Sequence, residues 1–199
     1  YKVVTNDWKE SLEWIKLNTP SDYIILSWWD YGFWITTISE RTTVVDNATI
    51  DSKQIQKVAN ILLSSPDDAW NMLQETGSDY VMIFVAGQKF QTTDENLLFL
   101  LEGGGDESKK MWFMKIAGVP VEKYLHSDGF SGTDYFWNET LLGKMIPFSL
   151  VAYTGTNNQI FPTYVPGFTG IYTIDIKYPE DGSGPLKLVY ASPSFIEQK

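Results

Sequence analysis

The sequence of 199 residues contains no cysteine and a single histidine, His126. The absence of cysteine excludes a disulfide framework, a thiol nucleophile and a cysteine-ligated zinc site. One histidine argues against a histidine-rich metal site and against most Ser-His triads. Because His126 lies in a stretch rich in Ser, Asp and Gly, we interpret it as a surface residue.

Basic residues and long apolar runs are scarce as well. Lys and Arg number 15 against 25 Asp and Glu, a formal net charge of −10, so nucleic acid is not expected as a partner. The longest apolar run, residues 80–86, is far shorter than the roughly 20 residues that a membrane-spanning helix needs. No N-terminal stretch has the layout of a signal peptide, and the sequence opens within a stretch that reads as folded, which predicts an excised domain.

Apolar periodicity and cap residues predict a domain in which helices and strands alternate. Helices are expected over residues 7–18, 51–63, 65–77, 97–101, 106–116 and 134–145. Strands are expected over residues 23–27, 42–45, 79–85, 170–177 and 185–190. Strands separated by helices are typical of βαβ units, which predicts a mixed or parallel sheet with helices packed on it.

The fold class is therefore predicted to be α/β (α+β), a helix-rich mixed domain around a small sheet with a β-rich C-terminal segment. After residue 150, Gly, Pro and Thr punctuate short β-rich runs. We accordingly divide the chain into an α/β core over residues 1–150, which carries the candidate site residues, and a β-rich segment over residues 151–199 packed on the same domain.

The segment Trp28-Trp29-Asp30-Tyr31-Gly32 follows directly after a predicted buried strand, where α/β sheets tend to place their sites. Two indoles supply N–H donors, and an ionised Asp30 supplies only acceptors. Together they match one hydroxyl group, so such a pocket would bind Ser, Thr or a sugar hydroxyl. Gly32 is expected to adopt a backbone angle that other residues disfavour, so that the segment can turn sharply. The alternative is a structural turn in which the Trp side chains pack inward and Asp30 caps backbone amides.

A second candidate lies on the helix predicted over residues 106–116. Lys110 and Met114 are four residues apart and therefore share one helical face. A cation beside a soft apolar side chain would complete a small pocket, with the thioether packed on a methyl group. The alternative is a solvated Lys beside a Met of the core.

The block Ser27-Trp28-Trp29-Asp30-Tyr31-Gly32 resembles the WWDYG signature of the catalytic subunit of oligosaccharyltransferase, the membrane enzyme that transfers a lipid-linked glycan to Asn in Asn-X-Ser/Thr sequons. The resemblance continues through residues 41–49, the helix near 52–63 and residues 79–81. Residues 185–195 are similar to the end of the archaeal members (AglB). Most of the chain is thereby covered.

The resemblance implies a role for each residue of the segment. In this family WWDYG binds the Ser or Thr at the +2 position of the sequon. Trp28, Trp29 and Asp30 would then be the hydrogen-bonding residues, and Tyr31 and Gly32 would shape the turn.

The family's second motif, DxxKxxxM or DxxKxxxI, lines the same pocket and admits two registers here. Counting from Asp106 gives Lys109 but places Phe113 in the last position. Counting from Glu107 restores Lys110 and Met114, with Glu in place of Asp. We prefer the second register, although the acidic position stays open between Glu107 and Asp106.

Cofactors and partners are implied by the same resemblance. The family binds a divalent metal, Mn or Mg, in an N-terminal membrane-embedded half, so no catalytic residue, metal ligand or cofactor is expected in this fragment, and the fragment alone is expected to be inactive. The implied partners are the acceptor polypeptide with its Asn-X-Ser/Thr sequence, the N-terminal transmembrane half and the lipid-linked oligosaccharide. The implied location is the extracytoplasmic face of the membrane.

Other readings of the sequence stay open at this point. A stand-alone carbohydrate-binding module would account for the 15% of aromatic residues through stacking platforms. A hydrolase with paired carboxylates such as Asp30 and Asp46 has no supporting spacing. The tripeptides that begin at Asn47 and Asn138 are themselves sequons, which is consistent with a domain outside the cytoplasm.

Overall fold

The computed structural model describes residues 5–92, 97–101, 103–155, 157, 159–178 and 185–196. The α-helices are α1 (Asn6–Asn18), α2 (Gly32–Trp34), α3 (Ser52–Leu63), α4 (Pro66–Thr76), α5 (Lys110–Ala117), α6 (Asp134–Glu139), α7 (Leu141–Met145) and α8 (Pro193–Ile196). Short 3-10 turns are η1 (Trp29–Tyr31), η3 (Asp106–Lys109) and η4 (Val121–Lys123), and η2 (Ile35–Ser39) is a π-helical turn.

The strands are β1 (Ile24–Leu26), β2 (Thr42–Thr43), β3 (Tyr80–Val81), β4 (Gln88–Thr92), β5 (Leu97–Leu100), β6 (Phe148–Thr154), β7 (Ile160–Phe161) and β8 (Thr169–Ile174). They form a three-stranded sheet and a five-stranded sheet. A mixed α/β fold with helices and small sheets is thus confirmed.

The chain divides into two compact units, each described here by itself. Unit 1 comprises the described residues within 1–58, 70–82 and 178–199, and unit 2 those within 59–69 and 83–177. The boundary expected at residue 150 stays a prediction; within unit 2, β6 runs across that position and pairs with β8. That residues 151–199 pack on the same domain as the rest also stays a prediction.

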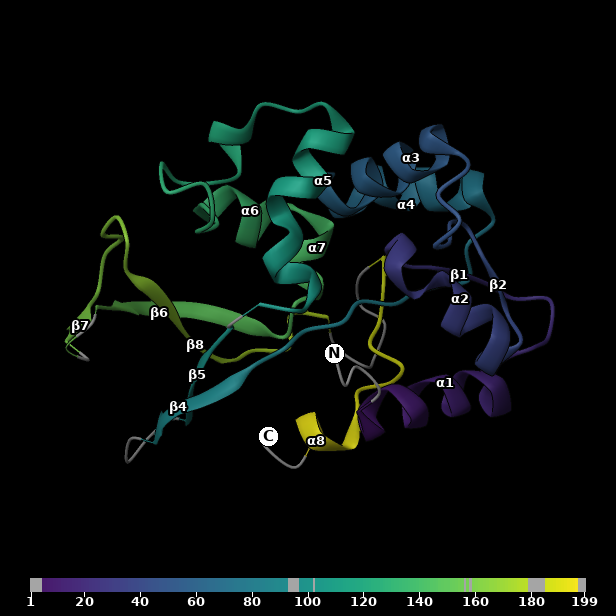
Figure 1. Cartoon of the computed structure of the whole chain (residues 1–199), viewed down its shortest axis with the longest axis horizontal. Coiled ribbons are helices and arrows are strands. Elements are labelled where there is room, and N and C mark those ends of the chain that lie inside the picture. Colours follow the sequence, from purple (N-terminus) through teal and green to yellow (C-terminus); the bar gives the residue numbers. More distant parts are fainter. Residues whose placement is uncertain are drawn as a thin grey trace. The chain divides into compact units, whose positions relative to one another are not determined.

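Unit 1 is built on the parallel sheet, in the order β2-β1-β3. The central strand pairs in parallel on both sides, with Ile25 opposite Thr43 and Tyr80. Two parallel strands need a crossover connection, and α3 and α4 lie between β2 and β3 in the chain (Figure 1). The predicted parallel arrangement is therefore confirmed, and it places the chain that follows β1 at the carboxyl edge of the sheet.

The buried guanidinium of Arg41 ties the end of α1 to the turn that precedes β2. It donates to the carbonyls of Lys16 at 2.7 Å, Thr19 at 2.5 Å and Ser39 at 3.0 Å, and to the Thr19 hydroxyl at 2.9 Å. The last carbonyls of a helix lack partners within the helix, and a cation near that end is favourable. Arg41 thus fixes the turn that follows η2.

Unit 2 contains the antiparallel sheet in the order β4-β5-β8-β6-β7. The helices α5, α6 and α7 lie on one side of this sheet in Figure 1. Trp137 of α6 and Tyr172 of β8 meet with ring centroids 5.3 Å apart. The core of this unit is largely aromatic and aliphatic; its fully buried side chains include Phe99, Phe113, Phe136, Leu141 and Leu142.

Three local predictions are wrong. Residues 97–101 were expected to be helical, but Leu97–Leu100 form β5, which pairs with β4 and β8. The single helix expected over residues 134–145 is two helices, because the Thr140 hydroxyl accepts a hydrogen bond from the Gly143 amide at 3.0 Å and caps α7. Residues 185–190, expected to be a strand, have no regular structure.

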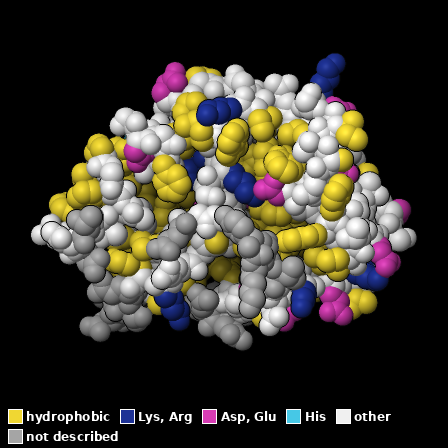
Figure 2. Space-filling view, viewed as in Figure 1, with side chains coloured by type: hydrophobic (Ala, Val, Ile, Leu, Met, Phe, Trp, Pro, Cys, Tyr) yellow, Lys and Arg dark blue, Asp and Glu magenta, His cyan; other side chains and the backbone are white. Residues whose placement is uncertain are grey.

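Large apolar side chains also reach the surface, as Figure 2 shows for one face. Those on the described residues include Trp112, Phe130 and Phe33. None of the helices in the described part of the chain has both the length and the apolar character needed to cross a membrane.

Candidate functional site

The Trp28–Gly32 segment lies immediately beyond β1, at the carboxyl edge of the parallel sheet in unit 1. Trp28 is still extended, with φ −64° and ψ 146°, and η1 follows. The amide of Tyr31 donates to the carbonyl of Trp28 at 3.2 Å and closes this turn. The strand thus positions the segment as predicted, and the tight turn sends successive side chains in different directions.

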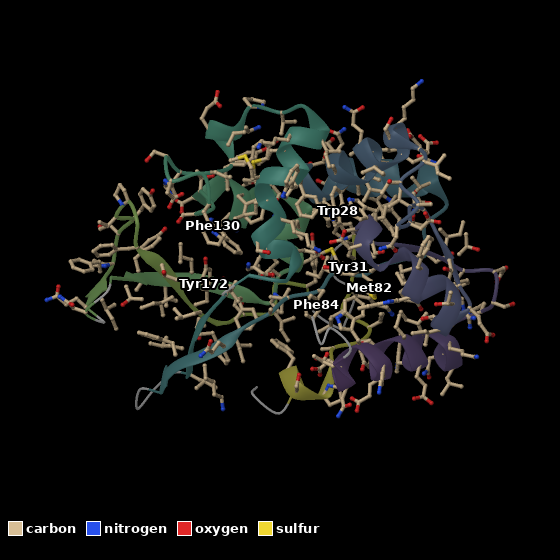
Figure 3. The ribbon with its side chains drawn as sticks, viewed as in Figure 1. Trp28, Tyr31, Met82, Phe84, Phe130 and Tyr172 are labelled. Atoms are coloured by element: carbon tan, nitrogen blue, oxygen red, sulfur yellow. The ribbon has the colours of Figure 1, made fainter. Side chains whose placement is uncertain are left out.

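Burial divides the segment into anchors and accessible residues. Trp28 and Tyr31, both labelled in Figure 3, are 2% and 5% exposed. Tyr31 packs on Trp8 of α1 with ring centroids 4.8 Å apart. Trp29 and Asp30 are partly exposed. Of the three residues predicted to bind a hydroxyl, Trp29 and Asp30 therefore reach the surface, whereas Trp28 belongs to the core of the unit.

Gly32 is required for a different reason from the one expected. Its φ of −55° and ψ of −46° are ordinary helical angles, which every residue adopts. A Cβ atom at this position would lie 2.4 Å from Cα of Asp46 and 2.6 Å from the carbonyl oxygen of Val45. The glycine therefore permits a close approach of two backbone segments, and the expectation of a special backbone angle is wrong.

The side chain of Asn47 meets the same segment. Its amide nitrogen donates to the carbonyl of Asp30 at 2.8 Å, and its oxygen accepts from the amide of Phe33 at 3.1 Å. The sequence places Asn47 in a turn, in a sequon and within the region of family resemblance, but it does not predict the contact of Asn47 with the WWDYG segment. Downstream, η2 is a π-helical turn, a feature that is frequent at functional sites.

In unit 2, Asp106 and Lys109 begin the element that leads into α5. The Asp106 carboxylate is buried, accepts from the amide of Phe84 at 3.0 Å and lies 3.5 Å from the Lys109 ammonium. The amide of Asp106 donates in return to the carbonyl of Phe84 at 2.7 Å. Asp106 thus fixes η3 against the segment around Phe84 and forms an ion pair with the lysine three residues later.

Glu107 and Lys110 are also buried, but they do not form an ion pair through their side chains. The Lys110 ammonium donates to the main-chain carbonyl of Glu107 and lies over the rings of Phe130, Phe136 and Trp137, at 4.8, 5.6 and 5.9 Å from their centroids. Burial lowers the pKa of Lys110 to about 8. Burial, and then the neighbouring Asp106, raise the pKa of Glu107 to about 7.

The last position of the second motif is apolar and buried in both registers. Phe113 and Met114 are each 0% exposed. The structure thus brings Asp106 and Lys109 together as an ion pair and holds Lys110 among aromatic rings. The WWDYG residues belong to unit 1 and this second group belongs to unit 2.

Two further observations concern binding sites in the described residues. An open hollow of about 210 Å³ lies in unit 1 between residues 43 and 55; Asp46 lines it, and none of residues 28–32 does. No group of three or more His, Asp or Glu side chains within the described part of the chain is arranged to hold a metal ion.

Comparison with known proteins defines the class to which this fold and segment belong. Residues 21–86 match the AglB core domain. The fold is similar to the crystal structure of the C-terminal globular domain of an oligosaccharyltransferase from Archaeoglobus fulgidus, with a TM-score of 0.50 and 24% identity over 86% of this chain and 99% of that one. The chain therefore has the fold of an AglB-type C-terminal domain.

Curated relatives extend the match along the chain. A subunit STT3B of dolichyl-diphosphooligosaccharide–protein glycosyltransferase from Oryza sativa is 33% identical over 98% of this chain and 25% of its own length. The subunit of the same name from Arabidopsis thaliana is 32% identical over 61% of this chain and 15% of its own length. The chain belongs to this AglB and STT3 family, as the sequence predicted, and it spans about a quarter of the length of the rice relative.

Proposed function

We propose that this chain is the sequon-recognition domain of an oligosaccharyltransferase that transfers a lipid-linked oligosaccharide to Asn of Asn-X-Ser/Thr. The observation that carries the proposal is the arrangement of residues 28–32 within the matched domain. Trp28 and Tyr31 anchor the turn, while Trp29 and Asp30 stay accessible beside it. An indole donor next to a carboxylate acceptor satisfies a hydroxyl that both accepts and donates, which is the chemistry of Ser and Thr at the +2 position.

This assignment also accounts for selectivity. A site built around a hydroxyl rejects the analogue that lacks it by up to about 10⁴–10⁵, because its polar groups are then left without partners. Peptides with Ala at the +2 position should accordingly be excluded, whereas Ser and Thr should both be accepted.

The second motif, at the start of α5 in unit 2, is proposed to contact the acceptor peptide as well. The contacts support the register that begins at Asp106, because Asp106 and Lys109 form the 3.5 Å ion pair. The register from Glu107 assigns the contact with the threonine methyl group to Met114, with Lys110 as the lysine of the motif; the Met114 side chain is 0% exposed and would have to become accessible to the peptide. The two registers predict different residues at that methyl group, so they are separable by the preference for Thr over Ser.

The remaining partners follow from the proposed role. The whole enzyme would combine this domain with a membrane-embedded half that holds Mn or Mg and the lipid-linked oligosaccharide, on the extracytoplasmic side. Glycosyl transfer would then require both parts, and the 199-residue chain alone would not catalyse it. A stand-alone carbohydrate-binding module would instead respond to free glycan without a peptide.

Replacement of Asp30 by Ala in the intact transferase tests this function. We expect Asp30→Ala to lower transfer to an Asn-Ala-Thr peptide by at least a hundredfold, because the hydroxyl then loses its acceptor. Asp22→Ala is the matched control, since Asp22 is exposed in the same unit just before β1 and outside the segment. Transfer at the normal rate by the folded Asp30→Ala enzyme would refute the assignment.

A further inference from the structure

Asn47 bonds to the backbone on both sides of Gly32. Its Nδ2 donates to the carbonyl of Asp30 at 2.8 Å, and its Oδ1 accepts from the amide of Phe33 at 3.1 Å. An amide side chain is a donor and an acceptor at once, so one residue satisfies two main-chain groups of opposite polarity. These two groups flank the point at which the turn η1 ends and α2 begins.

The loop that carries Asn47 is itself held tightly. The Asp46 carboxylate accepts from the amide of Ala48 at 2.8 Å, and the amide of Thr49 donates to the carbonyl of Asp46 at 3.1 Å. Thr49 has a φ of 51°, which is rare for a β-branched residue. Such a conformation persists only where the surrounding contacts impose it. Three residues earlier, the backbone of Asp46 lies close against Gly32.

We propose that Asn47 is a positioning residue that holds Asp30 and Trp29 in the orientation needed to bind the hydroxyl of the acceptor. The inference rests on the proposed function of the segment. The carboxylate of Asp30 extends from the same residue whose carbonyl accepts from Asn47, so the bond at 2.8 Å restricts rotation of that peptide unit. A site that must hold a hydroxyl between donor and acceptor depends on such restraint.

Substitutions at Asn47 separate the two bonds. Asn47→Ala removes both. Asn47→Asp keeps an oxygen that accepts from Phe33 but places a second oxygen against the carbonyl of Asp30, where no donor remains. Asn18→Ala is the matched control, because the Asn18 amide donates to the carbonyl of Trp14 at 2.9 Å on an exposed part of the same unit, away from the segment.

The experiment measures three quantities on the 199-residue chain: the exchange rate of the Phe33 amide by NMR, the Kd for an Asn-Ala-Thr peptide, and the midpoint of urea unfolding. We expect Asn47→Ala to speed Phe33 exchange and to raise the Kd, each by about tenfold, which is the effect of one hydrogen bond of roughly average strength. In Asn47→Asp the Kd should rise similarly while Phe33 stays protected. The unfolding midpoint should change no more than in Asn18→Ala.

The outcomes distinguish the inference from the function on which it rests. A wild-type Kd in Asn47→Ala, together with lost binding in Asp30→Ala, would overturn the positioning role and leave the hydroxyl-binding assignment in place. If Asn47→Ala and Asn18→Ala raise the Kd by the same factor and lower the unfolding midpoint by the same amount, the effect of Asn47 is one of general stability. That result would assign Asn47 a structural role and also overturn the inference. Unchanged binding in Asp30→Ala would refute the proposed function itself.

Discussion

Replacement of Glu107 by Gln should remove a pH-dependent penalty on the stability of unit 2. The Glu107 side chain is 1% exposed, and both of its carboxylate oxygens lack a hydrogen-bond partner among the described residues. Burial is the main cause that raises its pKa from 4.5 to about 7, and the neighbouring Asp106 raises it further. The folded protein therefore favours the protonated acid.

The sign of the effect follows from linkage. Because the pKa is higher in the folded state than in the unfolded state, the folded state binds more protons between pH 4.5 and 7. The contribution of Glu107 to the free energy of unfolding is therefore fully present below the pKa of the unfolded state, and it is lost as the pH rises through the pKa of the folded state. A difference of 2.5 between 7 and 4.5 corresponds to about 3 kcal/mol, of which about 2 kcal/mol is lost between pH 5.5 and pH 8.

Urea unfolding of the wild type and Glu107→Gln at pH 5.5 and pH 8 measures this penalty. Both pH values lie above the isoelectric point of about 4.5, and solubility is poorest at the isoelectric point itself. The free energy of unfolding of the variant, relative to that of the wild type, should be about 2 kcal/mol higher at pH 8 than at pH 5.5. This corresponds to about 4–8 °C in Tm for a chain of this size. Glu122→Gln, on the surface of the same unit, is the control and should leave the difference near zero. A Glu107→Gln difference that is the same at both pH values would refute the reasoning.

Two further substitutions test the geometry of the candidate sites. Gly32→Ala should destabilise unit 1 by about 1–3 kcal/mol, because overpacking against Asp46 outweighs the helical preference for Ala of up to about 1 kcal/mol; a stabilised variant in urea unfolding would show that the contact is not close. Met114→Ala in the intact transferase should reduce the preference for Thr over Ser sequons if Met114 contacts the methyl group. An unchanged ratio of transfer rates, in enzyme shown to be folded at the assay temperature, would instead support the register from Asp106.

Several helices and the first strand could be predicted from local signals. The apolar run that forms β1 is too continuous for a half-exposed strand. The sequence offers Ser65 as the cap of α4 and either Asp51 or Ser52 as the cap of α3; Ser65 accepts from the amide of Asp68 at 3.2 Å and Asp51 from the amide of Gln54 at 3.1 Å. These signals depend on neighbours in sequence. The position of the WWDYG segment at the end of β1 followed directly from them.

The predictions that failed concern features that depend on contacts between residues distant in sequence. The run Leu97–Leu100 is short and apolar, and periodicity alone cannot distinguish a strand from a buried helix in such a run. Its pairing with β8, more than sixty residues later, decides the outcome. Likewise the need for Gly32 arises from Asp46, and the role of Asn47 from Asp30 and Phe33; no local pattern reveals these approaches.

The candidate site on α5 was the hardest part to predict. Sequence reasoning weighed Lys110 as a solvated side chain against a pocket residue, whereas the structure buries it over three aromatic rings. Glutamate and lysine are almost never fully buried without a partner, so the burial of both Glu107 and Lys110 is contrary to the expectation for their residue types. Only the packing of the whole unit fixes that outcome.

The most direct test of the account is an NMR titration of the 199-residue chain with three peptides that contain Asn-Ala-Thr, Asn-Ala-Ser or Asn-Ala-Ala. The account predicts shifts of the Trp29 indole and the Asp30 amide with the Thr and Ser peptides, and none with the Ala peptide. Equal shifts with all three peptides, or no shift with any of them, would contradict the claim that this segment recognises the hydroxyl of the sequon.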